Sequence, residues 1–172
     1  MALQAPAPAE GPPEGIHSLA DISRVHSRLT PQRPALAFEG RTTTYEQLDT
    51  RASQVAHGLI AMGVKPGDRV AHLGKNTDWY LELLLGAAKA GAVMTPVNWR
   101  LAPREFAYII NDCEAKVLFV GPEFISAVEG LAEPLRVGEV VGMEAPFKGR
   151  AFVEWRDAQL YGDRKASCRE RV

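Results

Sequence analysis

The sequence predicts an α/β fold, a mainly parallel sheet with helices on both faces. Short apolar runs at 69–73, 92–97 and 116–120 alternate with segments of helical periodicity, which is the pattern that βαβ units produce. The run "KVLFV" has no polar alternation, as expected for a strand that is covered on both sides. The 172 residues are enough for one domain with its own hydrophobic core.

The elements before the first parallel strand are predicted in order as a helix, a hairpin and a second helix. Residues 16–29 carry apolar side chains at helical spacing, and "PALAFEG" with "RTTTY" predicts two short strands joined by a turn. The second helix has the clearest limits. Thr44 and Gln47 fit a capping box, and Gly63 takes the position where a left-handed residue ends a helix. "KPGD" then predicts a turn before the strand at 69–73.

From residue 78 onward helices and strands continue to alternate. Residues 78–90 are apolar nearly all round and predict a helix buried between layers, followed by a buried strand at 92–97. Pro103 suits the first position of the next helix, although Ala102 before it has no side-chain oxygen for an N-cap. After the strand at 116–120, "PEFISAVEGL" predicts a helix, "GEVVGM" a strand and "FVEWRDAQL" a last helical turn or two.

Composition and charge argue against several classes of function. Apolar residues make up 46% of the chain and charged residues 24%, and the formal net charge is −1, so no strong field favours nucleic acid or an anionic membrane. The four histidines and two cysteines show no metal-ligand spacing, and the cysteines form no disulfide framework, which suits a reducing compartment. No signal peptide or membrane-spanning run occurs, so we expect a cytoplasmic protein.

Three stretches of different composition are predicted along the chain. Residues 1–15 are rich in Pro, Ala, Gly and Glu and are expected to be a disordered tail. Residues 16–162 are expected to form the folded unit. Residues 163–172, "DRKASCRERV", are basic and lack apolar periodicity, and they break with everything before them. We expect this atypical tail to be foreign or frameshifted sequence.

The known nucleotide and nucleophile motifs are not found. "AHLGKNT" lacks the upstream glycine of a P-loop and has Asn76 where Ser or Thr follows the lysine. No GxGxxG follows a strand, and there is no nucleophile elbow. Local chemistry alone therefore predicts only a cytosolic α/β domain.

The order of the segments is more informative. "TTTYEQL" and "AKAGAVMTPVNWRL" resemble two conserved blocks of the adenylate-forming (AMP-binding) superfamily, and "GVKPGDRVAHLGKNT" resembles the segment that connects them. The resemblance covers roughly residues 17–131. The ending "VNWRL" is most similar to fatty-acyl-CoA synthetases, since peptide-synthetase domains typically have Asp at the position of Asn98. The resemblance implies the N-terminal subdomain of the acyl-CoA synthetase fold.

The resemblance also implies a reaction, its cofactors and a ligand-binding residue. In the family, a carboxylate such as a fatty acid attacks Mg²⁺-ATP to give acyl-adenylate, and the thiol of coenzyme A then displaces AMP. In some acyl- and aryl-CoA ligases the arginine of the N-x-R-L motif contacts a coenzyme A phosphate, which is Arg100 here; a guanidinium suits phosphate by charge and geometry. Arg100 as a loop-bracing surface residue is the alternative. Asn98 and Trp99 are weaker candidates, because an amide bonds its own turn and an indole packs.

The catalytic groups of the family do not occur in this sequence, so no catalytic residue or metal ligand is assigned. A Ser/Thr/Gly-rich loop ending in Pro-Lys-Gly, a Mg²⁺-binding Glu, a ribose-binding Asp and a C-terminal lysine are all missing. Three interpretations stay open: a truncated, inactive acyl-CoA synthetase, a non-catalytic module that binds acyl-CoA or a partner, and another adenylate-forming enzyme. We expect no tight binding of ATP, Mg²⁺ or coenzyme A, and self-association through surface left exposed by truncation.

Overall fold

The structure is a computed structural model that describes residues 15–159. The expected disordered tail at 1–15 lies outside the described residues except for Gly15, and the atypical tail at 163–172 lies wholly outside them. Both expectations therefore stay predictions, as does the limit at residue 162.

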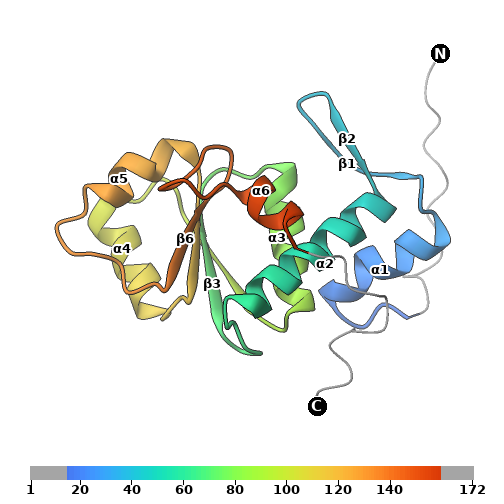
Figure 1. The fold of residues 1–172 in the computed structure, drawn as a ribbon, viewed down its shortest axis with the longest axis horizontal. Coiled ribbons are helices and arrows are strands. Elements are labelled where there is room, and N and C mark those ends of the chain that lie inside the picture. The colour runs from blue at the N-terminus through green and yellow to red at the C-terminus, as the bar shows by residue number, and fades with distance from the viewer. Residues whose placement is uncertain (1–14, 160–172) are drawn as a thin grey trace.

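Four parallel strands form the central sheet (Figure 1). They are β3 (Arg69–Leu73), β4 (Val93–Val97), β5 (Val117–Val120) and β6 (Glu139–Gly142), in the spatial order β4-β3-β5-β6. Pairing of β3 with β4 runs from Arg69 opposite Val93 to Leu73 opposite Val97. The three strands expected at 69–73, 92–97 and 116–120 thus lie in one parallel sheet, which confirms the predicted fold class.

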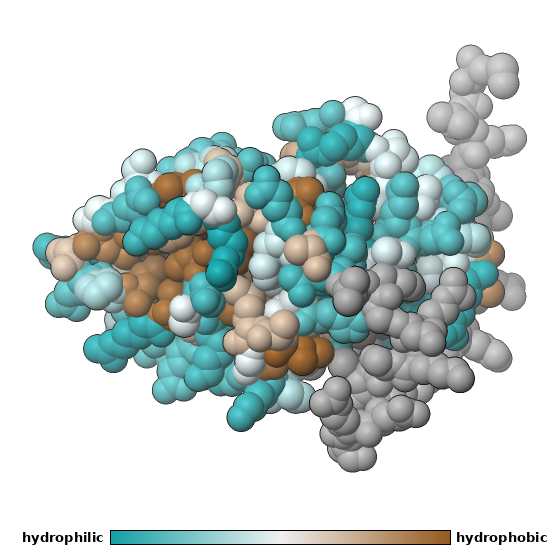
Figure 2. All heavy atoms as spheres, in the orientation of Figure 1, coloured by the Kyte–Doolittle hydropathy of each residue, from teal (hydrophilic) through white to brown (hydrophobic). Residues whose placement is uncertain are grey.

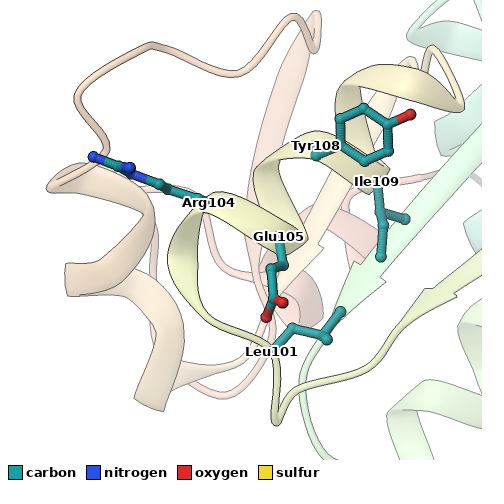
Figure 3. Close-up of a pocket in the computed structure, with 5 residues that line it drawn as sticks. All are labelled: Leu101, Arg104, Glu105, Tyr108 and Ile109. Carbon is teal, nitrogen blue, oxygen red and sulfur yellow. The ribbon is translucent and has the colours of Figure 1, made fainter.

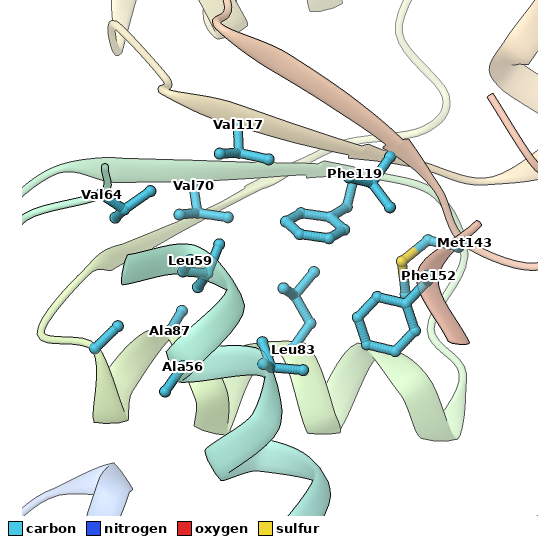
Figure 4. Close-up of a cluster of buried hydrophobic side chains, with 13 residues drawn as sticks. Ala56, Leu59, Val64, Val70, Leu83, Ala87, Val117, Phe119, Met143 and Phe152 are labelled. Carbon is cyan, nitrogen blue, oxygen red and sulfur yellow. The ribbon is translucent and has the colours of Figure 1, made fainter. Parts of the chain in front are cut away.

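Helices cover both faces of this sheet. On one face lie α2 (Tyr45–Ala61), α3 (Asp78–Lys89) and the short α6 (Phe152–Asp157); on the other lie α4 (Pro103–Asp112) and α5 (Ile125–Glu129). Figure 4 shows Val70, Val117 and Phe119 pointing from the strands toward the α2 and α3 side. Alternate strand residues such as Ala71 and Leu118 belong to the second core. Two cores on opposite faces explain why β5 is buried along its whole length.

An N-terminal layer packs outside α2 and α3. It contains α1 (Leu19–Leu29) and the antiparallel hairpin of β1 (Pro34–Phe38) and β2 (Arg41–Thr44), as predicted. The hairpin turns at Glu39 and Gly40, which both have positive φ (46° and 78°), a conformation that suits the right-handed twist of a two-residue hairpin. Arg41 ties the hairpin to α3, because its guanidinium donates to both carboxylate oxygens of Asp78 (3.1 and 2.8 Å).

The limits of α2 follow the predicted local rules. Thr44 Oγ1 accepts from the amide of Gln47 at 3.3 Å, and Gln47 Oε1 accepts from the amide of Thr44 at 3.0 Å, which completes the capping box. At the other end Gly63 has φ 82°, and the amide of Val64 donates to the carbonyl of Leu59. These bonds use groups that a helix end otherwise leaves without partners.

The start of α4 has half of a capping box. Ala102 has no side-chain oxygen to offer, as the sequence indicated, but Glu105 Oε2 accepts from the amide of Ala102 at 2.8 Å. Pro103 occupies the first helical position. One terminal amide is therefore satisfied by the third helical residue rather than by the cap itself.

Two sequence expectations need correction. The strand expected at 92–97 is not a buried strand but one edge strand of the sheet, with Val93 50% exposed, because strand order places β4 outside β3. The helix expected in "PEFISAVEGL" is split into a 3₁₀ turn, η1 (Pro122–Phe124), and the five-residue α5. Helix α3 is buried between layers as predicted, with no exposed residue from 78 to 89, and it also buries two carboxylates, Asp78 and Glu82.

Glu82 lies at the centre of a buried ion-pair network. Its side chain is 0% exposed, and its oxygens accept from Arg51 on α2 (3.1 Å) and from Arg156 on α6. Burial raises the pKa of Glu82, and the two guanidiniums act against that rise. The network joins three helices, so it braces the face of the sheet on which α2, α3 and α6 pack.

Candidate functional site

The carboxyl ends of β3 and β5 form a topological switch point, which is named the switch-point crevice. The chain leaves β3 toward α3 on one face and leaves β5 toward α5 on the other. In open α/β sheets, ligands bind outside the carboxyl ends of the strands at such a switch point. The loop that follows β4 lies at the same carboxyl ends of the strands, because β4 is parallel to β3 and pairs with it up to Val97.

The loop after β4 is a tight turn fixed by Asn98. Asn98 Oδ1 accepts from the amide of Arg100 at 3.0 Å, and its carbonyl accepts from the amide of Leu101 at 3.2 Å. This is an Asx-type turn, in which the amide side chain binds its own backbone. Asn98 therefore shapes the loop that presents Trp99 and Arg100.

Two cations lie against the indole of Trp99. The Cζ atom of Arg100 is 4.8 Å from the ring centroid, and Lys75 Nζ at the end of β3 is 5.9 Å from it. Trp99 is 40% exposed and Arg100 is exposed. No carboxylate within residues 15–159 forms an ion pair with Arg100. The three predicted site residues thus form one loop, and the structure adds Lys75 to them.

Glu123 lies across the crevice from this cluster. Its Oε1 pairs with Lys75 Nζ at 2.8 Å, and this hydrogen bond holds the pKa of Glu123 below its usual value. Between the two lie Gly74 and Gly121. A Cβ placed on Gly121 would be 3.2 Å from the Cα of Gly74, so the two backbones approach closely.

His72 is a buried group that the sequence interpretation did not single out. It is 3% exposed on β3, and its ring lies 4.8 Å from the ring of Tyr80 on α3. Burial lowers its pKa to about 4, so the imidazole is neutral at physiological pH. The strand run "RVAHL" could have indicated this burial, because His72 is flanked by apolar residues in a central strand.

A shallow open hollow lies beside the loop on α4 (Figure 3). Its wall is mainly apolar, and its lining residues are Leu101, Arg104, Glu105, Tyr108 and Ile109. In Figure 3 the side chain of Arg104 extends away from the other four. Figure 2 shows apolar residues gathered on the left of the view, over the end of the molecule built by α4, α5 and β6. This hollow lacks convergent polar groups.

Two further properties concern metals and membranes. Among residues 15–159, no group of three or more His, Cys, Asp or Glu side chains is arranged to hold a metal ion. None of the helices in the same range has the length and apolar character that crossing a bilayer requires.

Comparison with known families decides the relationship of this chain. A family model described as AMP-binding enzyme matches residues 24–161. The chain belongs to this family.

Relatives and a solved structure agree with this membership. The chain is 40% identical over 151 residues to ScoC, a fatty acid–[acyl-carrier-protein] ligase from Streptomyces coeruleorubidus, covering 87% of this chain and 28% of that protein. It is 42% identical over 106 residues to a feruloyl-CoA synthase from an Amycolatopsis species, covering 62% of this chain and 22% of that protein. A solved structure of a fatty acyl CoA synthetase from Mycobacterium tuberculosis has a TM-score of 0.75 and 29% identity to this chain, covering 88% of this chain and 30% of the other.

These comparisons confirm the fold that the resemblance implied. The architecture is that of the N-terminal region of acyl-CoA synthetases. The chain spans less than a third of the length of each of the three proteins named above.

Proposed function

We propose that this chain forms the N-terminal part of an ATP-dependent acid–thiol ligase. The single observation that supports this most is the exposed loop at residues 98–100, after the carboxyl end of β4. It lies in a chain that an AMP-binding family model matches over residues 24–161. In the proposed reaction a carboxylate oxygen attacks the α-phosphorus of ATP and pyrophosphate leaves. The thiol sulfur of coenzyme A then attacks the acyl carbonyl and AMP leaves.

The residues of this chain contribute to the second step. Arg100 is proposed to bind a phosphate of coenzyme A, which supplies the thiol when it is bound. Its exposed guanidinium has no carboxylate partner within residues 15–159, and Asn98 holds the turn that presents it. A guanidinium of this kind fits a phosphate by charge and by its two-pronged geometry. Trp99 is proposed to keep the guanidinium in place through its ring face.

The described residues of this chain do not include groups suited to the first step, the formation of acyl-adenylate from ATP. The described residues contain no cluster of acidic or imidazole ligands for Mg²⁺, and the sequence has no glycine-rich phosphate loop for ATP. No step is therefore assigned to Mg²⁺ or ATP on this chain. We propose that these 172 residues alone do not make acyl-adenylate and bind ATP weakly.

The acid substrate is proposed to be a fatty acid. The names of ScoC and of the Mycobacterium tuberculosis synthetase support a fatty acid, whereas the feruloyl-CoA synthase supports an aryl acid at similar identity. We propose a reducing, cytoplasmic setting, because the sequence has two cysteines and no disulfide framework.

A second candidate differs in the thiol that accepts the acyl group. ScoC matches 87% of this chain, against 62% for the feruloyl-CoA synthase, and is named a ligase for an acyl carrier protein. The acceptor would then be the phosphopantetheine thiol of a carrier protein, which has a phosphate close to the thiol arm as coenzyme A does. Arg100 suits either phosphate. The third interpretation, a module that only binds acyl-CoA or a protein, keeps Arg100 in the same binding role.

A chimera tests the ligase proposal. Residues 16–159 would replace the matching N-terminal part of the Mycobacterium tuberculosis fatty acyl CoA synthetase, and palmitate-dependent pyrophosphate release and palmitoyl-CoA formation would be measured separately. Arg100→Ala should weaken thioester formation by about 1–3 kcal/mol and leave pyrophosphate release nearly unchanged. Arg104→Ala, at an exposed arginine in the first turn of α4, is the matched control. Equal losses in both half-reactions would mean that Arg100 has a structural role.

The isolated chain tests the remaining proposals. ATP–pyrophosphate exchange with octanoate, palmitate or an aryl acid should not exceed that of a boiled sample. Sedimentation should show self-association, because the edge of β4 has no strand partner among residues 15–159. A monodisperse monomer that binds acyl-CoA without exchange would favour the binding-module interpretation.

A further inference from the structure

The switch-point crevice is lined by a charged pair that the proposed role of Arg100 does not use. Lys75 follows the end of β3 and Glu123 follows the end of β5, on the two sides of the position where the chain leaves the sheet toward opposite faces. The floor between them is formed by Gly74 and Gly121, whose backbones are in close contact. A crevice of this kind, at the carboxyl ends of parallel strands, is where open α/β sheets bind ligands.

We propose that Lys75 is a second phosphate-binding cation beside Arg100, and that Glu123 occupies Lys75 until the phosphate of the acyl acceptor displaces it. This inference rests on the proposed function, because it concerns the phosphate of the same acceptor. The ligand is a phosphate ester with an organic group attached, as in coenzyme A or in a carrier protein's phosphopantetheine.

The register of the sheet brings Lys75 to Arg100. Leu73 pairs with Val97, so the residues two positions further, Lys75 and Trp99, leave the sheet side by side. The measured contacts agree, since Lys75 Nζ is 5.9 Å from the centroid of the Trp99 ring and Arg100 Cζ is 4.8 Å from it. Both cations therefore contact the same indole. Like charges repel each other, and a phosphate bound by both would offset that repulsion.

The pair of Lys75 with Glu123 is one that a ligand can replace. The side chains are 56% and 45% exposed, and ion pairs at this exposure contribute at most about 1 kcal/mol. The 3′-phosphate of coenzyme A is a monoester dianion, which has more charge than the carboxylate and offers several acceptor oxygens to an ammonium group; the phosphodiester of a carrier protein's phosphopantetheine is a monoanion. Glu123 thus offsets one of the two positive charges beside Trp99 and favours ligands that carry more negative charge than one carboxylate.

The direct test is a titration of the ¹⁵N-labelled chain. The probes are 3′,5′-ADP, which represents the nucleotide end of coenzyme A, and 4′-phosphopantetheine, which represents the arm shared with carrier proteins. The signal is the indole N–H of Trp99, assigned with Trp99→Phe. Lys75→Gln should weaken binding of the preferred probe about fivefold, and Glu123→Gln should tighten it about threefold, each the effect of one partly screened charge.

The double variant separates direct exchange from a general charge effect. In the Lys75→Gln background, Glu123→Gln should no longer tighten binding, because the ammonium group that Glu123 would otherwise occupy is absent. The control is Lys116→Gln, at an exposed lysine just before the amino end of β5, and it should leave binding unchanged. Amide spectra of each variant verify the fold before titration.

Each other outcome overturns a defined part of the proposal. If Arg100→Gln weakens binding and Lys75→Gln does not, the Lys75 inference is wrong and the proposed role of Arg100 stands. If Glu123→Gln tightens binding equally in both backgrounds, Glu123 does not act through Lys75. If neither probe shifts the Trp99 signal at 10 mM, both the inference and the proposed phosphate site on this chain are wrong.

Discussion

Mild acid should destabilise this protein, because His72 is buried as a neutral imidazole. The side chain is 3% exposed on a central strand, and its ring packs against Tyr80. Burial lowers its pKa to about 4, whereas the same group in the unfolded chain has a pKa near 6.5. Between these two values the unfolded chain binds a proton that the folded chain does not.

The size of the effect follows from proton linkage. A depressed folded pKa contributes stability that is complete above the unfolded pKa and is lost as the pH falls toward the folded pKa. With values of 6.5 and 4, the free energy of unfolding should fall by about 2 kcal/mol between pH 7.5 and pH 5, and by about 3 kcal/mol at pH 4. The interval from pH 7.5 to pH 5 is the informative one, because ordinary carboxylates remain mostly ionised there.

Urea unfolding followed by tryptophan fluorescence at pH 7.5, 6 and 5 measures this change. His72→Gln should remove about 2 kcal/mol of the pH dependence over that interval, whatever it costs at pH 7.5. His17→Gln, at an exposed histidine, is the matched control and should leave the pH dependence as it is. The reasoning is refuted if wild type and His72→Gln lose the same free energy between pH 7.5 and pH 5.

Three further predictions concern stability and can be measured as shifts in urea midpoint and melting temperature. Ala102→Ser adds the missing hydroxyl at the N-cap of α4 and should stabilise the folded protein by about 1 kcal/mol. An unchanged urea midpoint would contradict the interpretation that this N-cap lacks a side-chain hydrogen bond. Gly86→Ala places a Cβ 2.5 Å from the Cβ of Val55 and should cost about 1–3 kcal/mol, an expectation that any stabilised variant would refute. Glu82→Ala leaves Arg156 without its main buried partner and should lower the free energy of unfolding by about 3–5 kcal/mol. A loss under 1 kcal/mol would show that the network does not brace the three helices.

The parts of the fold that short-range rules control were predictable. The capping box of Thr44 and Gln47 and the glycine at 63 involve groups within a few residues of each other, so the sequence contains all of the information. The parallel sheet was predictable because strands covered on both faces must be apolar throughout. The 3₁₀ turn before α5 was not, since a five-residue helix has too few positions to establish a period.

The remaining errors and omissions depend on contacts between distant segments. Glu82 is buried because Arg51 and Arg156 reach it from 31 and 74 residues away, and no local pattern marks those partners. The prediction of a buried strand at 92–97 was wrong, because its apolar residues do not show that it lies at an edge of the sheet. The loop 98–100 could be identified from sequence, but Lys75 could not be added to it. Its proximity to Trp99 arises from the register between two strands.

The buried ion-pair network has a consequence for synthesis on the ribosome. Arg156 lies near the end of the described chain, while Arg51 and Glu82 are translated long before it. A nascent chain that has emerged only to β6 must leave Glu82 with one guanidinium partner, and it also lacks Phe152, which completes the core on that face. Packing of α2 and α3 over the sheet should therefore reach its full stability only after residues 152–157 leave the exit tunnel.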